Sequence, residues 1–369
     1  MRVLMLSRAC MAGIYQRKLE EIATRGVELL TLVPPYWRDG SGATRLERLH
    51  TRGYRLETTA IRANGHFHLH HYPELGAALR DFRPDVLHVD EEPYNLAAWQ
   101  ALRLGRRAGC RTLFFCWQNI LRRYPPPFSL GERYVLRGAD HAIAGTTGAA
   151  DVLRAKGYGG PLSVIPQFGV DPQRFRPAGE RPSRPFTIGY FGRFVPEKGL
   201  HSLLEALTLL DRDCHLLAVG AGPLRPHLET MVIQLNLHGR VRLEAAQPSS
   251  AMPAQYGRID ALVLPSLTRR NWKEQFGRVL IEAMASGVPV VGSDSGAIPD
   301  VIGDAGLVFP EGDAAALAGK LRRLQREDGL RRHLAQRGRE RATLHFTHAG
   351  VADATVAVYR ELTDFPASS

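Results

Sequence analysis

Two cationic side chains, Arg193 and Lys198, stand close together in the stretch 192–199, which reads G-R-F-V-P-E-K-G. Its first residue, Gly192, and its last glycine give the backbone freedom to fold around a ligand. A diphosphate carries about two negative charges and is well bound by backbone N–H groups, a guanidinium fork and an ammonium charge. The stretch therefore predicts a diphosphate site, although an ordinary charged surface loop has the same composition.

Two carboxylates further along the chain, Glu274 and Glu282, are separated by seven residues. Glu274 stands in a polar loop that ends at Gly277, and Glu282 falls inside an apolar stretch, 278–286, that predicts a helix. The start of such a helix offers backbone N–H groups and a positive dipole end to an anion. An ordinary buried αβ unit with a surface glutamate would look similar.

The elements that must position these groups alternate between strands and helices. Predicted strands cover 186–191, 216–219, 241–244, 259–264, 288–292 and, completing the sheet, 300–302 with 307–308. Predicted helices cover 200–210, 224–237, 278–286, 314–325, 329–344 and 349–362. Gly222 lies in a glycine turn after the second strand, and Gln247 lies in the loop after the third. This alternation predicts a parallel sheet with ligands at the carboxyl ends of its strands.

The first half of the chain shows a similar alternation. Predicted strands cover 2–6, 27–33, 54–61, 84–89, 111–116, 142–144 and 162–166, and 34–42 is predicted as a loop. Predicted helices cover 14–25, 73–82, 96–108, 130–137 and 147–156. The turn after the first strand holds only Gly13, so it lacks the three glycines of a dinucleotide-binding fingerprint.

The stretch 177–185 is rich in proline, charge and small residues and predicts a linker. We therefore expect an N-terminal Rossmann-like domain at 1–176, a C-terminal Rossmann-like domain at 177–348, and a C-terminal helix within 349–369. The fold class is α/β, with two doubly wound domains.

Composition excludes several classes of protein. The 369 residues contain no apolar run long enough for a membrane span, and the N-terminus lacks a signal-peptide cleavage site. Four scattered cysteines without metal-ligand spacing indicate reduced thiols, so we expect a cytoplasmic protein. Residues 1–176 carry 25 Lys and Arg against 16 Asp and Glu, so the net charge of +11 lies mostly there. Such a basic half favours an anionic partner, or is simply a solvated face.

Two polar groups in the first half are candidates for contact with a ligand. His66, His68 and His70 would share one face of an extended chain, but no acidic or cysteine residue stands at a metal-ligand spacing, so we favour a loop with hydrogen-bonding rings and expect no metal. Glu91 belongs to a carboxylate cluster, 90–92, at the end of a predicted strand, where open α/β sheets bind ligands. The same cluster could instead stabilise the start of a helix.

The spacing of Glu274 and Glu282, followed by A-M-A-S-G-V-P-V-V, resembles the signature of the retaining, nucleotide-sugar-dependent glycosyltransferases of family 4. The loop 193–199, the G-A-G-P turn and Ser266 occur in the order and spacing that this family shows. The resemblance covers nearly all of the second domain and is weaker in the first. It implies the GT-B fold, with two domains facing across a cleft and the last helix crossing back onto the first.

The resemblance also implies roles for the residues. Arg193 and Lys198 would neutralise the leaving diphosphate, Glu274 would accept hydrogen bonds from the transferred sugar, and Glu282 would accept them from the ribose. Gly13, Gly192, Gly222 and Gln247 would contribute to donor binding, together with the backbone groups of Phe276, Gly277, Arg278 and Val279. Many relatives place a histidine after the strand at 111–116; here Gln118 and Asn119 stand near that place and, with His70 and Glu91, are candidates for the acceptor side.

The predicted activity is transfer of a hexose from a UDP- or GDP-sugar to a glycan, lipid or small-molecule acceptor, with retention of anomeric configuration. No metal or other cofactor is expected, because two side-chain cations and a helix dipole serve the diphosphate. The expected partners are the nucleotide sugar, a glycan or lipid-linked acceptor and, peripherally, the anionic inner face of a membrane, but not nucleic acid. A nucleotide-sugar 2-epimerase of the same fold and a non-catalytic protein that binds anionic membranes or glycans remain as alternatives.

Overall fold

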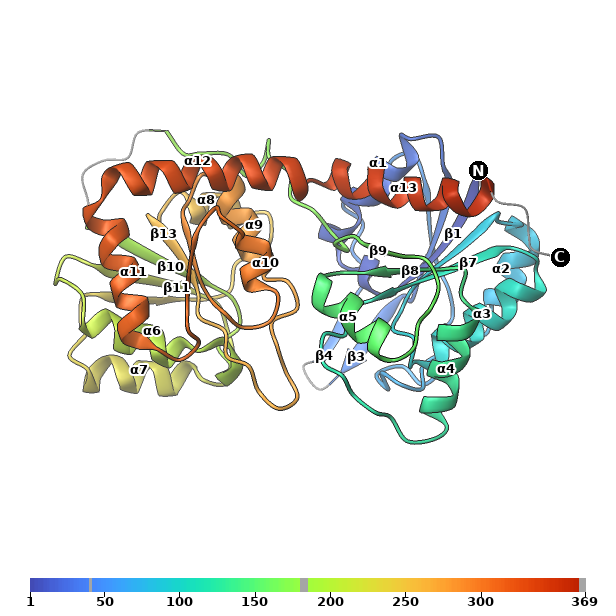
Figure 1. Cartoon of the computed structure of the whole chain (residues 1–369), viewed down its shortest axis with the longest axis horizontal. Helices are drawn as coiled ribbons and strands as arrows, with labels where there is room; N and C mark the ends of the chain where they lie inside the picture. Colours follow the sequence, from blue (N-terminus) through green and yellow to red (C-terminus); the bar gives the residue numbers. More distant parts are fainter. Residues whose placement is uncertain (40–41, 180–184, 365–369) are drawn as a thin grey trace. The chain divides into compact units, whose positions relative to one another are not determined.

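The computed structural model describes residues 1–39, 42–179 and 185–364. The chain separates into two compact units, each an α/β domain built on its own parallel sheet (Figure 1). The first unit comprises Met1–Gly169 together with the chain from His348 onward, and the second comprises Val170–Thr347. The predicted fold class, two Rossmann-like α/β domains, is therefore confirmed.

The sheet of the first unit has seven strands in the order β5-β2-β1-β6-β7-β8-β9, and all neighbouring pairs are parallel. The strands are β1 (Arg2–Ser7), β2 (Glu28–Val33), β5 (Arg55–Thr58), β6 (Val86–Asp90), β7 (Arg111–Cys116), β8 (His141–Ala144) and β9 (Leu162–Val164). The central strands are buried along almost their whole length, as expected of parallel strands covered on both faces. Their carboxyl ends meet at one edge, where polar loops can gather.

Helices cover both faces of this sheet. They are α1 (Arg17–Ala23), α2 (Leu75–Phe82), α3 (Leu96–Arg107), α4 (Phe128–Gly138), α5 (Thr147–Ala155) and α13 (His348–Asp364). Helices α2 to α5 pack on one face, where Leu4 and Leu87 belong to the shared core. Helices α1 and α13 pack on the other face, against Val3 and Val86. Alternation of side chains along each strand thus divides the core of this unit into two layers.

Polar contacts anchor the last helix, α13, to the rest of the first unit. The hydroxyl of Tyr359 lies 2.6 Å from Nδ1 of His88 in β6, and both residues are buried. Burial holds the pKa of His88 well below its usual value, so the imidazole is neutral and shares one hydrogen bond with the Tyr359 hydroxyl. At the surface, Arg25 pairs with Asp353 at 2.6 Å. The C-terminal helix is therefore an integral part of the first domain.

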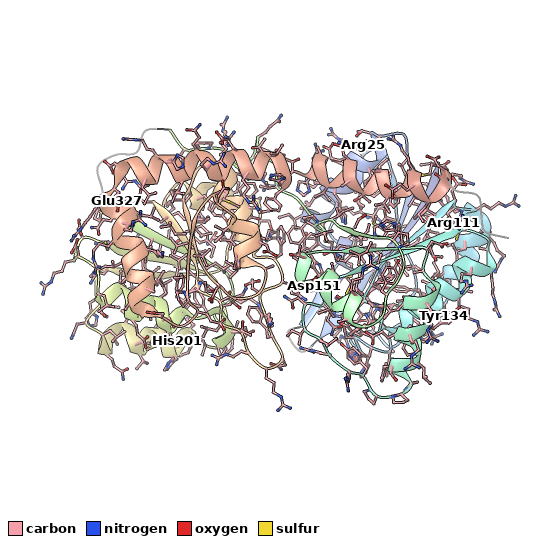
Figure 2. All side chains as sticks on the ribbon, in the orientation of Figure 1. Arg25, Arg111, Tyr134, Asp151, His201 and Glu327 are labelled. Carbon is pink, nitrogen blue, oxygen red and sulfur yellow. The ribbon has the colours of Figure 1, made fainter. Side chains whose placement is uncertain are left out.

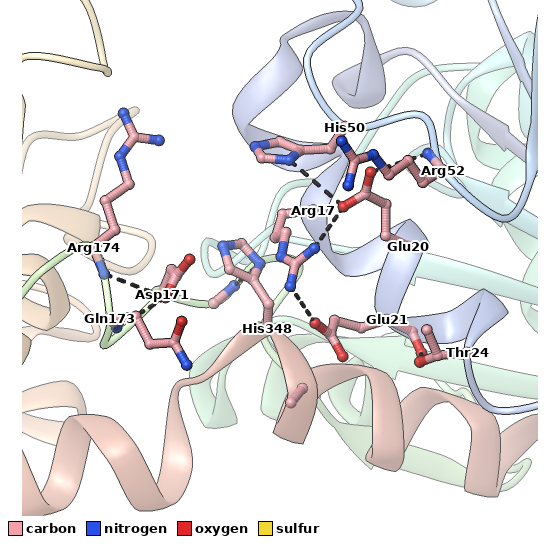
Figure 3. A network of polar contacts seen from close by, with 12 residues as sticks. Arg17, Glu20, Glu21, Thr24, His50, Arg52, Asp171, Gln173, Arg174 and His348 are labelled. Atoms are coloured by element: carbon pink, nitrogen blue, oxygen red, sulfur yellow. Dashed lines mark hydrogen bonds and ion pairs between the residues drawn. The ribbon is translucent and has the colours of Figure 1, made fainter.

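A polar network on α1 fixes the loop that precedes β5 (Figure 3). Glu20 accepts hydrogen bonds from the guanidinium of Arg17 at 2.6 Å and from the backbone N–H of Arg52 at 3.0 Å. Burial raises the pKa of Glu20, but these donors and nearby His50 outweigh it and hold the pKa below its usual value. Glu20 is thus a carboxylate that ties a loop to a helix.

The sheet of the second unit has six parallel strands in the order β12-β11-β10-β13-β14-β15. The strands are β10 (Thr187–Phe191), β11 (His215–Val219), β12 (Val241–Glu244), β13 (Ala261–Leu264), β14 (Val290–Ser293) and β15 (Leu307–Phe309). The helices are α6 (Leu200–Thr208), α7 (Arg225–Gln234), α8 (Met252–Tyr256), α9 (Arg278–Ala285), α10 (Ile298–Ile302), α11 (Ala314–Arg326) and α12 (Asp328–His345). Strand β10 lies near the middle, so the loop after it is surrounded by the loops after β11 and β13.

Some predicted helices, strands or loops differ from the structure in their type or bounds. Residues 300–302 belong to helix α10 rather than to a strand, because Pro299 starts a helical turn whose Ile298 and Ile302 pack beside β14 at Gly292. The stretch 34–42 is not only loop: β3 (Tyr36–Asp39) pairs with β4 (Gly42–Arg45) as an antiparallel hairpin. The predicted helix at 14–25 begins only at Arg17, after a short 3₁₀ turn.

No helix in the described residues combines the length and the apolar character that crossing a membrane needs. The four cysteines, Cys10, Cys110, Cys116 and Cys214, are all buried and unpaired with one another. Burial raises the pKa of Cys10 to about 11, so this thiol stays protonated near neutral pH.

Candidate functional site

The loop after β10 carries the two predicted cations. Arg193 follows Gly192 directly, its side chain is 65% exposed, and its guanidinium lies 3.7 Å from the carboxylate of Glu197. Lys198 ends a short 3₁₀ turn, η3 (Pro196–Lys198), and is followed by Gly199. Gly199 has φ +66°, and a Cβ there would lie 2.0 Å from the carbonyl oxygen of Pro265. Only glycine lets this loop lie directly against the end of β13.

Lys198 is joined to Glu274 in a buried cluster at the ends of β10 and β13. Its Nζ lies 2.5 Å from Oε2 of Glu274, and the Ser266 hydroxyl donates to the same oxygen at 2.7 Å. The ring of Trp272 lies 5.0 Å from Nζ. The two predicted catalytic groups are thus in direct contact although 76 residues separate them.

The loop after β14 supports the backbone of Glu274. Gly296 has φ +59°, and a Cβ at this position would lie 2.1 Å from the carbonyl oxygen of Glu274. That carbonyl accepts a hydrogen bond from the N–H of Ala297 at 3.1 Å. The motif 272–296 therefore folds back on itself, so that its last glycine holds its first glutamate in place.

Helix α9 starts at Gly277, whose φ of +79° is the left-handed conformation that turns the chain into the helix. The first turn of an α-helix directs N–H groups away from the helix body, and the helix dipole makes this end attractive to anions. Arg278 and Val279 form this turn. The side chain of Phe276 instead points into the core, where its ring lies 5.7 Å from that of Phe346. The buried ring of Phe276 is therefore part of the packing beneath the start of α9.

The second predicted carboxylate, Glu282, is buried one turn into α9. Its Oε2 accepts a hydrogen bond of 2.7 Å from the Tyr256 hydroxyl, and its Oε1 lies 3.0 Å from Nε of Arg278. Burial raises the pKa of Glu282, while Arg278, Tyr256 and the more distant Arg174 oppose that rise. Tyr256 and Arg278 therefore hold the Glu282 carboxylate in place, and its ionisation depends on these neighbours.

A pocket of about 260 Å³ connects Glu282 with the loop after β10. Six predicted site residues line it: Gly192, Arg193, Gln247, Arg278, Val279 and Glu282. Gly222 lies outside this lining and has a structural role, because a Cβ there would lie 2.3 Å from the carbonyl oxygen of Phe194. The amide of Gln247 donates to the carbonyl of Ala245 at 3.2 Å, so it shapes its own loop.

The sequence prediction missed Tyr256. It stands at the end of the short helix α8, 26 residues before the glutamate that it contacts, and no motif marks it. Arg174 was also missed; its guanidinium donates to the carbonyl of Ser249 at 3.1 Å, beside the same pocket. Ser266 was noted as part of the resemblance, but its contact with Glu274 depends on the register of β13. These contacts are tertiary and have no signal in local spacing.

In the first unit, His70 and Glu91 lie together near the carboxyl end of β6. Nε2 of His70 lies 3.4 Å from Oε1 of Glu91, and the Tyr72 hydroxyl donates to that oxygen at 3.2 Å. Burial raises the pKa of Glu91, but His70, Arg8 and Tyr72 outweigh it and hold the pKa below its usual value. Both residues are buried, and these contacts favour the ionised form of Glu91.

The histidine stretch is a turn and not the extended segment that the prediction assumed. The N–H groups of Leu69 and His70 both donate to the carbonyl of His66, which closes the chain on itself. His68 packs instead among aromatic rings, including those of Tyr94 and Tyr124. The described residues contain no group of three or more histidine, cysteine or acidic side chains arranged to hold a metal ion.

Gln118 and Asn119 follow β7, the strand beside β6. The Gln118 amide donates to the Tyr124 hydroxyl at 2.7 Å, and its oxygen accepts from Lys156 at 2.8 Å. Asn119 is half-buried in the same loop. The predicted acceptor-side residues therefore lie at the ends of two neighbouring strands. Gly13, predicted to contribute to donor binding, belongs to the first unit, where its N–H donates to Glu47 at 2.7 Å. It is not among the residues that line the pocket of the second unit.

Comparison with known proteins agrees with this geometry. The profile of the family Glycosyl transferases group 1 matches residues 171–341, and that of the Glycosyl transferase 4-like domain matches residues 14–167. The chain belongs to the group 1 glycosyltransferases of family 4, which have the GT-B fold.

Relatives of known description include glycosyltransferases of several biosynthetic routes. The lipopolysaccharide core biosynthesis glycosyltransferase LpsE of Rhizobium meliloti (strain 1021) is 26% identical over 351 residues, which cover 90% of each chain. A D-inositol 3-phosphate glycosyltransferase of Streptomyces bingchenggensis (strain BCW-1) is 30% identical over 63% of this chain and 55% of its own. WcaL of Escherichia coli (strain K12) is 29% identical, and the match spans 63% of its length.

Solved structures show the same fold. Sucrose-phosphate synthase from Thermosynechococcus elongatus superposes with a TM-score of 0.76 and 22% identity, covering 98% of this chain and 99% of that one. Anabaena Alr3699/HepE, solved with UDP and glucose, has a TM-score of 0.71 and 17% identity, with coverage of 98% and 100%.

Proposed function

We propose that this glycosyltransferase transfers a hexose from a UDP- or GDP-sugar to a glycan, lipid-linked or small-molecule acceptor, with retention at the anomeric carbon. The observation that carries the proposal is the contact of Lys198 with Glu274 beside the start of α9. This contact places a cation that can stabilise a phosphate leaving group beside a carboxylate that can accept hydrogen bonds from sugar hydroxyls. The Anabaena neighbour was solved with UDP and glucose, which supports a nucleotide-sugar donor here.

The donor is proposed to lie along the pocket of the second unit. Glu282, ionised and held by Tyr256 and Arg278, accepts hydrogen bonds from the ribose hydroxyls. The diphosphate lies against Arg193, Lys198 and the N–H groups at the start of α9. Because Arg193 is largely exposed, its side chain has the freedom to reach a phosphate oxygen.

The proposed reaction is front-face attack, in which the acceptor oxygen approaches from the side that the diphosphate leaves. The bond between the anomeric carbon and the diphosphate oxygen breaks, the bond to the acceptor oxygen forms, and the departing diphosphate takes the acceptor proton. Negative charge grows on the leaving group in the transition state, so Lys198 and Arg193 stabilise that state more than the ground state. Glu274 orients the sugar and is not a nucleophile. The proposal needs no metal or other cofactor.

Two measurements test the proposal. Isothermal titration with UDP-glucose, GDP-mannose, UDP and GDP should show binding of at least one nucleotide, and binding of none would refute it. Replacing Lys198 by alanine should reduce turnover roughly 100-fold or more, since one lost transition-state contact of this kind costs about 3 kcal/mol. Lys320→Ala, on α11 of the same unit, is the matched control and should keep full turnover.

The products of a turnover assay separate this proposal from an epimerase of the same fold. A transferase releases nucleoside diphosphate in proportion to the glycosylated acceptor. Free nucleoside diphosphate or an epimerised sugar formed without any acceptor would instead establish the 2-epimerase. Binding without any turnover in a panel of acceptors would leave a non-catalytic binding protein.

The acceptor is proposed to bind the first unit near the ends of β6 and β7, where Gln118, Asn119 and the aromatic rings beside His68 are found. A glycan or a lipid-linked sugar fits the polar and aromatic character of these loops. Peripheral association of a cytoplasmic enzyme with an anionic membrane is part of the same proposal, because the basic charge of the chain is concentrated in its first half.

A further inference from the structure

A groove of about 1200 Å³ on the first unit lies between helices α3 and α4. The residues that line it do not belong to the donor-binding motifs of the second unit. Apolar groups of Leu96, Trp99 and Leu104 line it from α3. Leu130 and Tyr134 line it from α4, and they are 59% and 40% exposed. Figure 2 shows Tyr134 on the outer side of α4. Large apolar side chains gathered at an exposed groove mark a surface that binds something.

The groove is a fixed feature of the fold. A Cβ at Gly131 would lie 1.8 Å from the ring of Trp99, so only glycine lets α4 pack directly on this indole. The Trp99 ring nitrogen donates to the carbonyl of Pro93 at 3.0 Å, which fixes its orientation. Because packing and a hydrogen bond hold Trp99 in place, its ring stays in the apolar lining of the groove and does not rotate out into solvent.

The rim of the groove is strongly basic. We define the α3–α4 surface by its exposed residues: Arg103, Arg106, Arg107, Leu130, Arg133, Tyr134 and Arg137. Helix α3 contains no acidic residue, and the single acidic residue of α4, Glu132, is buried and paired with Lys156 at 2.5 Å. Glu132 thus serves an interior contact. The five arginines therefore present their positive charge without acidic neighbours on their own helices.

We propose that the α3–α4 surface docks the enzyme on an anionic phospholipid bilayer. The arginines contact headgroup phosphates, for which guanidinium groups have matching geometry. Leu130 and Tyr134 enter the boundary between headgroups and acyl chains, where tyrosine places its ring in the apolar layer and its hydroxyl in water. The α3–α4 surface is thus the part of the chain that makes the membrane association named in the proposed function. The docking rests on that function only because a lipid-linked acceptor would lie in the same membrane.

Charge argues against a second copy of the chain as the occupant. A symmetric dimer formed through this surface would bring the five arginines of one copy against the same five of the other. Like charges close together are unfavourable at an interface, particularly where apolar groups exclude water. An anionic bilayer satisfies both the apolar groove and the basic rim.

The test is sedimentation of the full chain with vesicles of phosphatidylglycerol and phosphatidylcholine, compared with phosphatidylcholine alone. The first variant, Arg103→Gln with Arg107→Gln, removes charge. The second, Leu130→Gln with Tyr134→Gln, removes the apolar contact. The matched control is Arg212→Gln with Arg332→Gln, two exposed arginines of the second unit. UDP binding by isothermal titration is measured for every variant as a check on folding and on the donor site.

We expect binding to the anionic vesicles only, weakened by added salt. The charge variant should bind about 25-fold more weakly, since each of its two arginines contributes roughly fivefold at an anionic surface. The apolar variant should also weaken, the control should bind as the wild type does, and UDP affinity should stay unchanged throughout. Equal binding to neutral vesicles, an equal loss in the control, or self-association abolished by Leu130→Gln would overturn the proposal. Retained UDP binding with no vesicle binding would overturn the docking surface alone and leave the proposed function intact.

Discussion

The hydrogen bond from Tyr256 to Glu282 offers a sharp test of how the donor pocket works. Replacing Tyr256 by phenylalanine removes one hydroxyl and leaves the ring in place against Phe191 and Phe175. Burial raises the pKa of Glu282, and this hydroxyl is one of the groups that opposes the rise. The variant should therefore hold Glu282 in its neutral form over a wider range of pH.

The size of the effect follows from the geometry. A hydrogen bond to a charged group contributes about 1.5–3 kcal/mol, so its loss shifts the ionisation equilibrium of Glu282 by roughly tenfold or more. If the ribose binds only to the ionised carboxylate, UDP affinity in the variant should fall at lower pH and recover toward that of the wild type as the pH rises. The sign follows from the raised pKa: the protonated, weakly binding form is populated on the acidic side.

The assay is isothermal titration of UDP at several pH values, with Tyr158→Phe as the matched control. Tyr158 is also a buried tyrosine whose hydroxyl donates to a carbonyl, that of Pro161 at 2.9 Å, but it lies in the first unit. The control should show wild-type affinity at every pH. A Tyr256→Phe variant with unchanged affinity, or with a loss that does not vary with pH, would refute the role given to Glu282.

Three further results are expected. Gly199→Ala should destabilise the second unit by about 1–3 kcal/mol, visible as a lower urea midpoint, because it places a Cβ 2.0 Å from the carbonyl of Pro265 at φ +66°; an unchanged midpoint would contradict the described loop. Tyr359→Phe should cost about 1–3 kcal/mol of unfolding free energy by leaving buried Nδ1 of His88 without its hydrogen-bond partner, whereas a wild-type denaturation curve would show that the contact is not needed. Excess EDTA should leave turnover unchanged, and a loss that Mg²⁺ restores would contradict the proposed use of Lys198 in place of a metal.

The donor side was largely predictable because its residues stand at the ends of regular elements. Glycines at 192, 199 and 277 precede or follow strands and helices, and apolar periodicity places those elements in order. Once β10 and β13 pair in parallel, Lys198 and Glu274 come from loops at the same edge of the sheet. Local patterns and one topological rule were enough to bring these two residues near each other.

The remaining details depend on tertiary packing. Spacing in the sequence does not indicate that the Tyr256 hydroxyl reaches Glu282. Buried Tyr256 of α8 contacts α9 through tertiary packing, and no sequence motif marks this contact. The histidine stretch alternates like a strand, yet backbone hydrogen bonds to His66 close it into a turn. Residues 300–302 resemble a short apolar strand, and the difference from a helix depends on packing against Gly292. Short segments of this kind take their conformation from their neighbours.

The discontinuous first unit has a consequence for biosynthesis. Its sheet is complete by Val164, but the face that α13 covers stays exposed until the ribosome has also made the whole second unit and residues 348–364. During that interval Val3, Val86 and His88 lack the helix that shields them. Chains that emerge N-terminus first normally complete their first domain first. Here the second domain is contained in one continuous segment and can reach its native state earlier. The part of the sheet face that α13 covers therefore stays exposed in the nascent chain while more than 170 further residues are synthesised.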